Sequence, residues 1–361
     1  MLRAGLIGYP ATGKTTLFRL MTSAREGVRP GHHGKTDANV GISRVPDARL
    51  DRLTAMFNPR KHVPATVEFA DMAGGGRGGA KDLVDVAPFR NADALVHVVR
   101  AFRDESVAHA AGSVDPARDH RTMDEELMLA DLGIVERRLE RLEKDLKKGA
   151  TPDLKREHEV LLACRDALEN GRPLRGLGLA GEDAKRLRGF QFLSAKPLLL
   201  VLNVDEADIA GLDGAIERAG LGGVTGEHTR AVALCAKIEL EIAELEPADA
   251  AAFLADLGLT ESGLDRVIRA SYDLLGYLSF FTVGEDECRA WSIPRGTVAQ
   301  DAAGEIHSDL QRGFIRAEVV AYDHLVARGS LAACREHGEL RLEGKEYVVH
   351  DGDVINVRFA T

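Results

Sequence analysis

The sequence lacks the features that mark membrane-spanning and secreted proteins. No apolar run approaches the roughly 20 residues that a helix needs to cross a bilayer. A glycine-rich stretch follows the first residues at once, which interrupts the layout expected of a signal peptide. We therefore expect a cytoplasmic protein without a membrane partner.

Cysteine is scarce, with four residues in a chain of 361. They lie too far apart for a metal-binding pair, and a disulfide framework is not expected at this size: Cys164, Cys235, Cys288 and Cys334. The single tryptophan, Trp291, does not make a platform on which bases could stack. A net charge of -10 argues against wholesale coating of nucleic acid, so no DNA partner is expected, but it leaves room for a local basic face.

Apolar runs separated by helical stretches make up the first part of the chain. Strands are expected at five places: residues 2–7, 63–70, 92–99, 198–203 and 231–235. Because most of these runs are continuous rather than alternating, they favour an α/β fold in which helices cover both faces of a mostly parallel sheet. Residues 22–44 show little periodicity and predict a long mobile loop.

A charged stretch interrupts this pattern between the third and fourth strands. Leucine and isoleucine follow one helical face through residues 121–148, Gly149 to Pro152 breaks the helix, and leucines then recur at seven-residue intervals. Two antiparallel helices in a short coiled-coil hairpin would produce this spacing. The alternative is a pair of amphipathic helices packed on the main domain.

The C-terminal part of the chain changes composition again. Short β-rich runs occur at residues 280–283, 317–322, 346–349 and 354–359. The sequence His350-Asp351-Gly352-Asp353 predicts a hairpin turn between the last two runs. The chain thus divides into a main domain at 1–118 and 195–277, a helical insertion at 119–194 and a separate α+β domain at 278–361.

The stretch GYPATGKT has the glycine spacing and the Lys-Thr pair of a phosphate-binding loop. A strand precedes it and a helix follows it, so its backbone N–H groups can wrap a phosphate at the helix N-terminus. In this arrangement the catalytic Lys14 bridges the β- and γ-phosphates, and Thr15 ligates Mg²⁺. The residues expected to contact the nucleotide are Gly8, Tyr9, Pro10, Ala11, Thr12, Gly13, Lys14, Thr15 and Thr16.

A second motif, Asp71-Met72-Ala73-Gly74, ends the second predicted strand. A carboxylate at a strand end followed by a glycine turn suits a sensor of the γ-phosphate. Asp71 would hold the magnesium through water, and the Gly74 N–H would reach the phosphate. Many surface turns contain this pattern, so it indicates a nucleotide site only in combination with the phosphate loop one strand away.

The candidate base site follows the fourth strand, where GTPases place Asn-Lys-x-Asp. Here Asn203 is kept, Glu206 takes the position of the guanine-binding Asp, and Val204 takes that of the stacking Lys. These changes weaken selectivity for guanine, but spacing does not show selectivity for adenine. Backbone contacts to the base are expected after the fifth strand, from Cys235, Ala236 and Lys237. The alternative is that Asn203 and Glu206 are ordinary polar residues of a loop.

Together these residues resemble the YchF or Obg-like ATPases, in the translation-factor class of P-loop proteins. Matching stretches run along nearly the whole chain, among them GKTTLF, HVVRAF, GLDRVIRA, GFIRAEVVAYDHL and LRLEGKEYVVHDGDV. The resemblance implies a nucleotide domain, a coiled-coil insertion and a C-terminal TGS domain of β-grasp type. It further implies use of ATP as well as or better than GTP, with Asn203 and Glu206 at the base. It also implies binding to the ribosome, at its large subunit, through the coiled coil and the TGS-like domain, with a role in translation or stress.

The phosphate loops depart from the pattern of that family. Ala11 stands where the family keeps an Asn that ligates a monovalent cation in potassium-dependent relatives, which puts potassium dependence in doubt. Lys35 stands at the position of the first-switch Thr, and Thr36 next to it is the remaining candidate hydroxyl for Mg²⁺. The second switch, GGGRGGAKD, is short and glycine-rich, so ordering it would cost backbone entropy.

His109 matches a family histidine and is the candidate for orienting water or the phosphates, with a packing role as the alternative. Two functions are therefore open. The chain is either a switch that slowly hydrolyses ATP or GTP with Mg²⁺, or a nucleotide-binding scaffold that docks on the ribosome without useful turnover.

Overall fold

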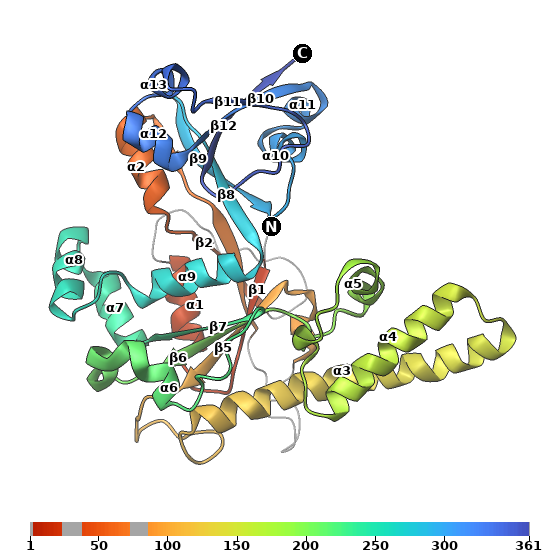
Figure 1. Cartoon of the computed structure of the whole chain (residues 1–361). Helices are drawn as coiled ribbons and strands as arrows, with labels where there is room; N and C mark the ends of the chain where they lie inside the picture. Colours follow the sequence, from red (N-terminus) through yellow and green to blue (C-terminus); the bar gives the residue numbers. More distant parts are fainter. Residues whose placement is uncertain (1–2, 24–37, 73–85, 361) are drawn as a thin grey trace. The chain divides into compact units, whose positions relative to one another are not determined.

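The computed structural model describes residues 3–23, 38–72 and 86–360 (Figure 1). Their contacts divide the chain into two compact units. The first unit comprises Met1–Ile42 and Glu68–Leu274, and the second comprises Ser43–Val67 and Leu275–Thr361. The division predicted from sequence placed residues 43–67 in the main domain and did not anticipate that they group with the C-terminal residues.

The first unit is built on a six-stranded sheet in the order β2-β4-β1-β5-β6-β7. Its strands are β1 (Arg3–Ile7), β2 (Ala38–Arg44), β4 (Thr66–Met72), β5 (Ala94–Arg100), β6 (Leu198–Asn203) and β7 (Thr229–Leu234). Neighbouring strands from β4 to β7 run parallel. Every residue of β5 and β6 is buried, so both faces of the sheet are covered there, and the predicted parallel α/β sheet is confirmed.

The first unit contains helices that pack on this sheet and helices of the insertion. They are α1 (Lys14–Ser23), α3 (Pro116–Lys148), α4 (Pro152–Glu169), α5 (Gly181–Leu187), α6 (Ala215–Arg218), α7 (Ala236–Glu244), α8 (Pro247–Asp256) and α9 (Gly263–Leu274). Short 3-10 turns are η1 (Ala87–Asn91), η2 (Leu174–Gly176), η3 (Arg188–Phe190) and η4 (Glu206–Gly214). Helix α3 packs on β5, α9 packs on β5, β6 and β7, and α1 contacts α7 and α9.

The prediction of a loop over residues 22–44 is wrong at both ends. Helix α1 continues to Ser23, and Ala38–Arg44 forms the edge strand β2. Gly41 obscured the strand, because glycine weakens a strand pattern. A Cβ at Gly41 would lie 2.3 Å from Cγ2 of Thr22, so glycine is needed where β2 passes the end of α1. Residues 24–37 lie outside the described residues.

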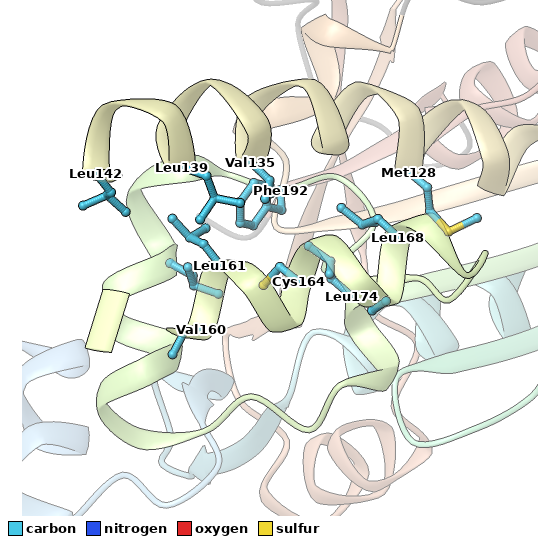
Figure 2. Close-up of a cluster of buried hydrophobic side chains, with 12 residues drawn as sticks. Met128, Val135, Leu139, Leu142, Val160, Leu161, Cys164, Leu168, Leu174 and Phe192 are labelled. Carbon is cyan, nitrogen blue, oxygen red and sulfur yellow. The ribbon is translucent and has the colours of Figure 1, made fainter. Parts of the chain in front are cut away.

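The insertion is a hairpin of α3 and α4 (Figures 1 and 2). Asp115 and Thr151 cap the two helices, each accepting a hydrogen bond from a backbone N–H of the first turn. Apolar side chains of α3 meet those of α4 in one buried cluster: Met128, Val135, Leu139, Leu142, Val160, Leu161, Cys164 and Leu168. The helices therefore pack on each other, as the predicted hairpin requires.

Helix α3 also belongs to the core of the sheet. Its residues Met123 and Leu127 are buried in a cluster with Ile7 and Leu95. One unbroken helix of 33 residues thus runs from the sheet into the hairpin. The predicted domain boundary between residues 118 and 119 falls in the first turn of this helix.

The second unit has a sheet in the order β11-β10-β12-β8-β9-β3. Its strands are β3 (Lys61–Val63), β8 (Tyr277–Thr282), β9 (Glu287–Pro294), β10 (Phe314–Ala321), β11 (Arg341–Glu343) and β12 (Asp353–Phe359). Its helices are α2 (Ala48–Phe57), α10 (Ala299–Ile306), α11 (Ser308–Arg312), α12 (Tyr322–Arg328) and α13 (Leu331–Glu336). The core between sheet and helices includes Phe280, Ile293, Ala302, Ala317, Val319 and Ile355.

Residues 43–67 are an integral part of this second unit. Strand β3 pairs in parallel with β9, and α2 packs on β9. Arg49 of α2 donates a hydrogen bond to the Asp351 carboxylate at 2.8 Å, and its guanidinium carbon lies 5.2 Å from the centre of the Phe281 ring. Sequence periodicity does not report such long-range pairings.

Two predictions for the C-terminal part are wrong. Among the described residues, 346–349 form only one isolated bridge, between Val298 and Val348. The turn at His350–Asp353 closes no hairpin, because β12 pairs with β10 and β8. The Asp351 carboxylate instead accepts hydrogen bonds from Arg49 and from the Ser279 N–H. Over the part of the chain that the structure describes, no helix is both long enough and apolar enough to cross a membrane.

Candidate functional site

The glycine loop follows β1, the strand between β4 and β5. Gly8 and Gly13 have φ values of 144° and 96°, which side chains rarely adopt. A Cβ at Gly8 would lie 2.4 Å from the Val98 carbonyl oxygen, and one at Gly13 would lie 2.5 Å from Nδ2 of Asn203. Both glycines of the phosphate-loop pattern are therefore required by the backbone that the loop adopts.

Lys14 is the first residue of α1, and its side chain folds back over the loop. Its Nζ donates to the carbonyl oxygens of Gly8 at 2.8 Å and Tyr9 at 2.6 Å. Burial lowers the pKa of Lys14 to about 8, although the nearby charge of Asp71 opposes that effect. The ammonium is thus held at the loop whose backbone N–H groups were predicted to wrap a phosphate.

Thr15 and Asp71 bring two oxygen atoms together beside this loop. The strand register sets Asp71 of β4 opposite Leu6 of β1, and the Thr15 hydroxyl donates to Oδ2 of Asp71 at 3.1 Å. Hydroxyl and carboxylate oxygens are ligands that Mg²⁺ prefers, so the pair fits the predicted metal site. Thr36 and Gly74, the other predicted ligands of metal and γ-phosphate, lie outside the described residues.

The remaining loop residues differ in what they present. Tyr9 is buried, and its phenol, whose pKa burial raises, lies near Thr122 of α3, so it offers the site only its backbone. Thr12 is buried and its hydroxyl donates to the Tyr9 carbonyl at 3.1 Å. Pro10 and Ala11 are exposed, and Thr16 lies in the first turn of α1. Ala11 has a φ of 61°, a left-handed conformation in which Asn is better tolerated than Ala.

Asn203 connects the phosphate loop to the predicted base loop. Its Nδ2 donates to the Thr12 carbonyl at 3.1 Å, and its Oδ1 accepts from the Ala236 N–H at 3.0 Å. The side chain is buried, and both polar groups of its amide are used. Asn203 therefore links the two segments through its side chain, so it is not an ordinary polar residue of a loop.

Glu206 begins η4 after β6, Lys237 lies in the first turn of α7 after β7, and their side chains form an ion pair. Hydrogen bonding to Glu206 and its negative charge raise the pKa of Lys237. Val204 is buried in an apolar cluster with Leu202 and Ile209, so it is not free to stack on a base. Cys235 is also buried, and burial raises the pKa of its thiol.

Both ring nitrogens of His109 face protein atoms, but only Nδ1 makes a hydrogen bond. Nδ1 accepts from the Ala111 N–H at 3.1 Å, and Nε2 lies 2.9 Å from Oδ2 of Asp119, although those two atoms are not aligned for a hydrogen bond. Asp119 is bound in turn by Arg118. This placement favours the packing alternative, and a catalytic role for His109 stays a prediction.

Sequence reasoning missed Arg100, which organises the loop that carries His109. This arginine ends β5 and is 2% exposed, and its guanidinium donates to three backbone carbonyls of the loop: Phe102, Asp104 and Val107. A charged residue at the end of the apolar run ALVHVVR was the signal available. Buried charges need such hydrogen bonds to be tolerated.

The chain is similar over its whole length to proteins that bear one name. It is 45% identical to the "Ribosome-binding ATPase YchF" of Bacillus subtilis (strain 168), over 99% of each chain. It is 38% identical to the protein of the same name from Escherichia coli O157:H7, again over 99% of each. Residues 277–360 match the family model YchF-GTPase_C, described as a protein of unknown function.

A solved structure agrees with these sequence matches. The "Structure of the Schizosaccharomyces pombe YchF GTPase" superposes with a TM-score of 0.86 at 28% identity, covering 99% of this chain and 97% of that one. Agreement over this length confirms the predicted fold class, including the helical insertion and a C-terminal domain of the same type.

Proposed function

Since the chain belongs to the YchF family, we propose that it is a nucleotide-dependent switch that binds ATP or GTP with Mg²⁺, hydrolyses it slowly and binds the ribosome. The observation that carries the nucleotide part is the convergence of Lys14, Thr15 and Asp71 where β1 and β4 end. The ribosome part rests on the name of the relatives, ribosome-binding ATPase. A ribosomal partner also supports the expected place in the cytoplasm.

Each residue of the cluster has a role that its chemistry supports. The Lys14 ammonium, now bonded to two carbonyl oxygens, would exchange them for phosphate oxygens and offset their charge. Thr15 and Asp71 would hold Mg²⁺, which supplies charge neutralisation to the phosphates. The loop from Gly8 to Gly13 would direct its backbone N–H groups at the same anion.

Base selectivity would come from the second pair of loops. Asn203 fixes the distance between the phosphate loop and the loop of Ala236. The Glu206 carboxylate is an acceptor for the exocyclic amine that adenine and guanine both carry. Because Glu206 is one methylene longer than the Asp of GTPases and is paired with Lys237, we propose ATP as the preferred substrate, with GTP also accepted.

Chain connectivity supports a coupling between nucleotide and the second unit. The predicted first-switch residues Lys35 and Thr36 precede β2, and the predicted second switch, residues 74–82, follows β4. Between them, residues 43–67 belong to the second unit. A rearrangement in either switch segment would therefore be transmitted along a strand to the second unit.

The tip of the hairpin supports contact with ribosomal RNA. Its exposed basic residues include Lys144, Lys147, Lys148 and Lys155. Lys148 makes one ion pair there, with Asp145 at 3.5 Å. In a chain of net charge -10, this local cluster is where a phosphate backbone would be attracted.

The second candidate function is a scaffold that binds nucleotide and ribosome without useful turnover. The observation in its favour is His109, whose two ring nitrogens both face protein atoms. In that case the switch would respond to exchange of bound nucleotide rather than to hydrolysis.

One experiment separates the two candidates. Single-turnover hydrolysis of labelled ATP and GTP would be followed with excess protein, with and without potassium and ribosomes. Product formation above the Lys14→Ala background supports the switch, and bound but unhydrolysed nucleotide under all conditions supports the scaffold. Ribosome co-sedimentation in each nucleotide state then tests whether binding depends on the nucleotide.

A further inference from the structure

The second unit contains a strand edge that the proposed function does not use. Strand β10 pairs with β12 along its whole length, from Asp353 to Phe359. On the other side β8 pairs in parallel with β12, with Phe281 opposite Val354, and β8 ends at Thr282. In the described ranges, no strand pairs with the outer edge of residues 356–359.

A groove of about 400 Å³ follows this open edge. Thr282 lies at the end of β8, and apolar walls come from Ile306 and Leu310 on one side and Leu331 of α13 on the other. Alternate residues of a strand direct their N–H and C=O groups to one edge, so part of 356–359 presents unpaired backbone groups to the groove. Such an edge is a template for one more strand.

One carboxylate and one guanidinium line the groove, Glu318 and Arg335, and a second guanidinium, that of Arg358, lies beside it on the same carboxylate. Glu318 is nearly buried, and its carboxylate accepts hydrogen bonds from Arg335 at 3.0 Å, from Asn356 at 2.9 Å and from Arg358. Two guanidiniums therefore share one carboxylate. The side chains of Arg335 and Arg358 are 63% and 55% exposed, so their other N–H donors remain accessible.

We propose that this groove binds an extended peptide segment of a partner protein. The segment adds a strand along residues 356–359, directs an apolar side chain toward Ile306 and Leu310, and pairs an alternate, acidic side chain with Arg335 and Arg358 on the other face. Main-chain hydrogen bonds supply affinity, and the arginine pair selects a carboxylate. This inference is independent of the nucleotide site.

Two other occupants are less consistent with the groove. A phosphate backbone would bind the arginines but would leave the apolar walls and the open edge unused. A second copy of the chain would have to bring a complementary edge, and such pairing would make self-association depend on Arg335. Both occupants are outcomes of the test below.

The test begins with a display selection of random seven-residue peptides against the full chain. We expect the enriched peptides to combine an acidic residue with neighbouring β-branched or aromatic residues. Synthetic copies of them would be titrated by fluorescence anisotropy, and hydrogen exchange would be measured with and without peptide. Alternate amides within 356–359 should become protected, and N-methylation of alternate peptide residues should weaken binding.

Matched variants then locate the binding site. Arg335→Ala should weaken peptide binding about tenfold, because a charge-assisted pair is lost. Arg328→Ala should leave it unchanged, since Arg328 is a partly exposed arginine of the neighbouring helix that pairs with Glu339 outside the groove. Arg335 is exposed, and Glu318 keeps two other donors in its absence, so the variant should fold.

Several results would overturn the proposal. They are the absence of any enriched peptide, equal binding by Arg335→Ala and wild type, or protection that appears away from 356–359. Direct binding of a single-stranded RNA oligonucleotide that is lost in Arg335→Ala, without any peptide binding, would assign the arginines to nucleic acid instead. A dimer detected by sedimentation equilibrium and lost in Arg335→Ala would assign the edge to a second copy.

Discussion

Lysine is used in opposite ways at the glycine loop and at the tip of the helical hairpin. Lys14 is held by two carbonyl oxygens, and burial lowers its pKa to about 8. Lys144, Lys147 and Lys155 at the tip are exposed. A fixed ammonium suits one small anion of defined geometry, whereas exposed, flexible ammonium groups suit an extended anion without sequence recognition.

The largest expected effect is on Mg²⁺–ATP affinity and concerns Asp71, which lies near the half-buried Lys14. Replacing Asp71 by Asn removes the negative charge that faces the magnesium. Mg²⁺–ATP affinity should then fall about a hundredfold, because losing one partner of a buried charge pair costs about 2–5 kcal/mol. Isothermal titration calorimetry with Mg²⁺ and with EDTA measures this. Thr15→Ser keeps the hydroxyl and is the control, which should bind as wild type does. An unchanged magnesium effect in Asp71→Asn would show that these oxygens do not hold the metal.

The second prediction concerns Asn203, which ties the phosphate loop to the base loop. Asn203→Ala leaves the Thr12 carbonyl and the Ala236 N–H without their partner, so the free energy of unfolding should fall by about 2 kcal/mol. Urea denaturation monitors this change. Asn170→Ala, at the exposed end of α4, should change stability by less than about 0.5 kcal/mol. If Asn203→Ala and Asn170→Ala lower the free energy of unfolding equally, the two hydrogen bonds of Asn203 do not explain its loss of stability.

The third prediction tests whether the exposed lysines of the hairpin tip contribute to ribosome binding. Replacing Lys144, Lys147 and Lys148 together by Glu should weaken ribosome co-sedimentation about tenfold or more at low salt and reduce its salt dependence. Nucleotide affinity should not change, because the three lysines lie at the far end of the 33-residue helix α3, whereas Lys14 begins α1. Lys185→Glu, on α5 outside the tip, is the control. Loss of ribosome binding by the control as well would argue for general repulsion rather than a local contact.

The fourth prediction uses pH to distinguish Lys14 from the lysines of the tip. Below its pKa of about 8, Lys14 is protonated with and without nucleotide. Phosphate raises that pKa, so above pH 8 binding must take up a proton, and affinity should fall by up to about tenfold per pH unit. Calorimetry from pH 7 to 9.5 tests this, since these values span the pKa. Lys14→Arg should give a flatter profile, and an identical profile would assign the dependence to another group.

The smallest expected effect is at Ala11, whose backbone is left-handed. A left-handed conformation at φ 61° strains Ala but not Gly. Ala11→Gly should therefore raise the free energy of unfolding by about 0.5–1 kcal/mol, and Ala11→Asn should also stabilise the loop. Thermal denaturation compares the variants. A destabilised Ala11→Gly would mean that the positive φ is not kept in solution.

Much of the nucleotide unit was predictable because its signals are local. The strand at 198–203 has the predicted bounds, since the run LLLVL is apolar throughout and the polar Asn203 follows it at the strand end. Gly8, Gly13 and Lys14 were identifiable because the loop's backbone geometry and chemistry restrict those positions. Asn203 was identified by its position, but its two hydrogen bonds to loops distant in sequence were not.

What was missed depends on contacts between distant parts of the chain. Residues 43–67 appear local to the main domain, and only Arg49 with Asp351 and β3 with β9 show where they pack. The hairpin at His350–Asp353 was predicted from turn chemistry alone, although Asp351 serves other partners. Local patterns do not specify which distant residue a charged side chain will meet.

The central claim is that the cluster of Lys14, Thr15 and Asp71 is the nucleotide site. Equilibrium binding of labelled ATP with Mg²⁺ at pH 7, to wild type and to Lys14→Ala, tests it most directly, with circular dichroism to verify that the variant is folded. We expect one nucleotide-binding site per chain in the wild type and loss of ATP binding in folded Lys14→Ala. Unchanged ATP affinity in folded Lys14→Ala would contradict it.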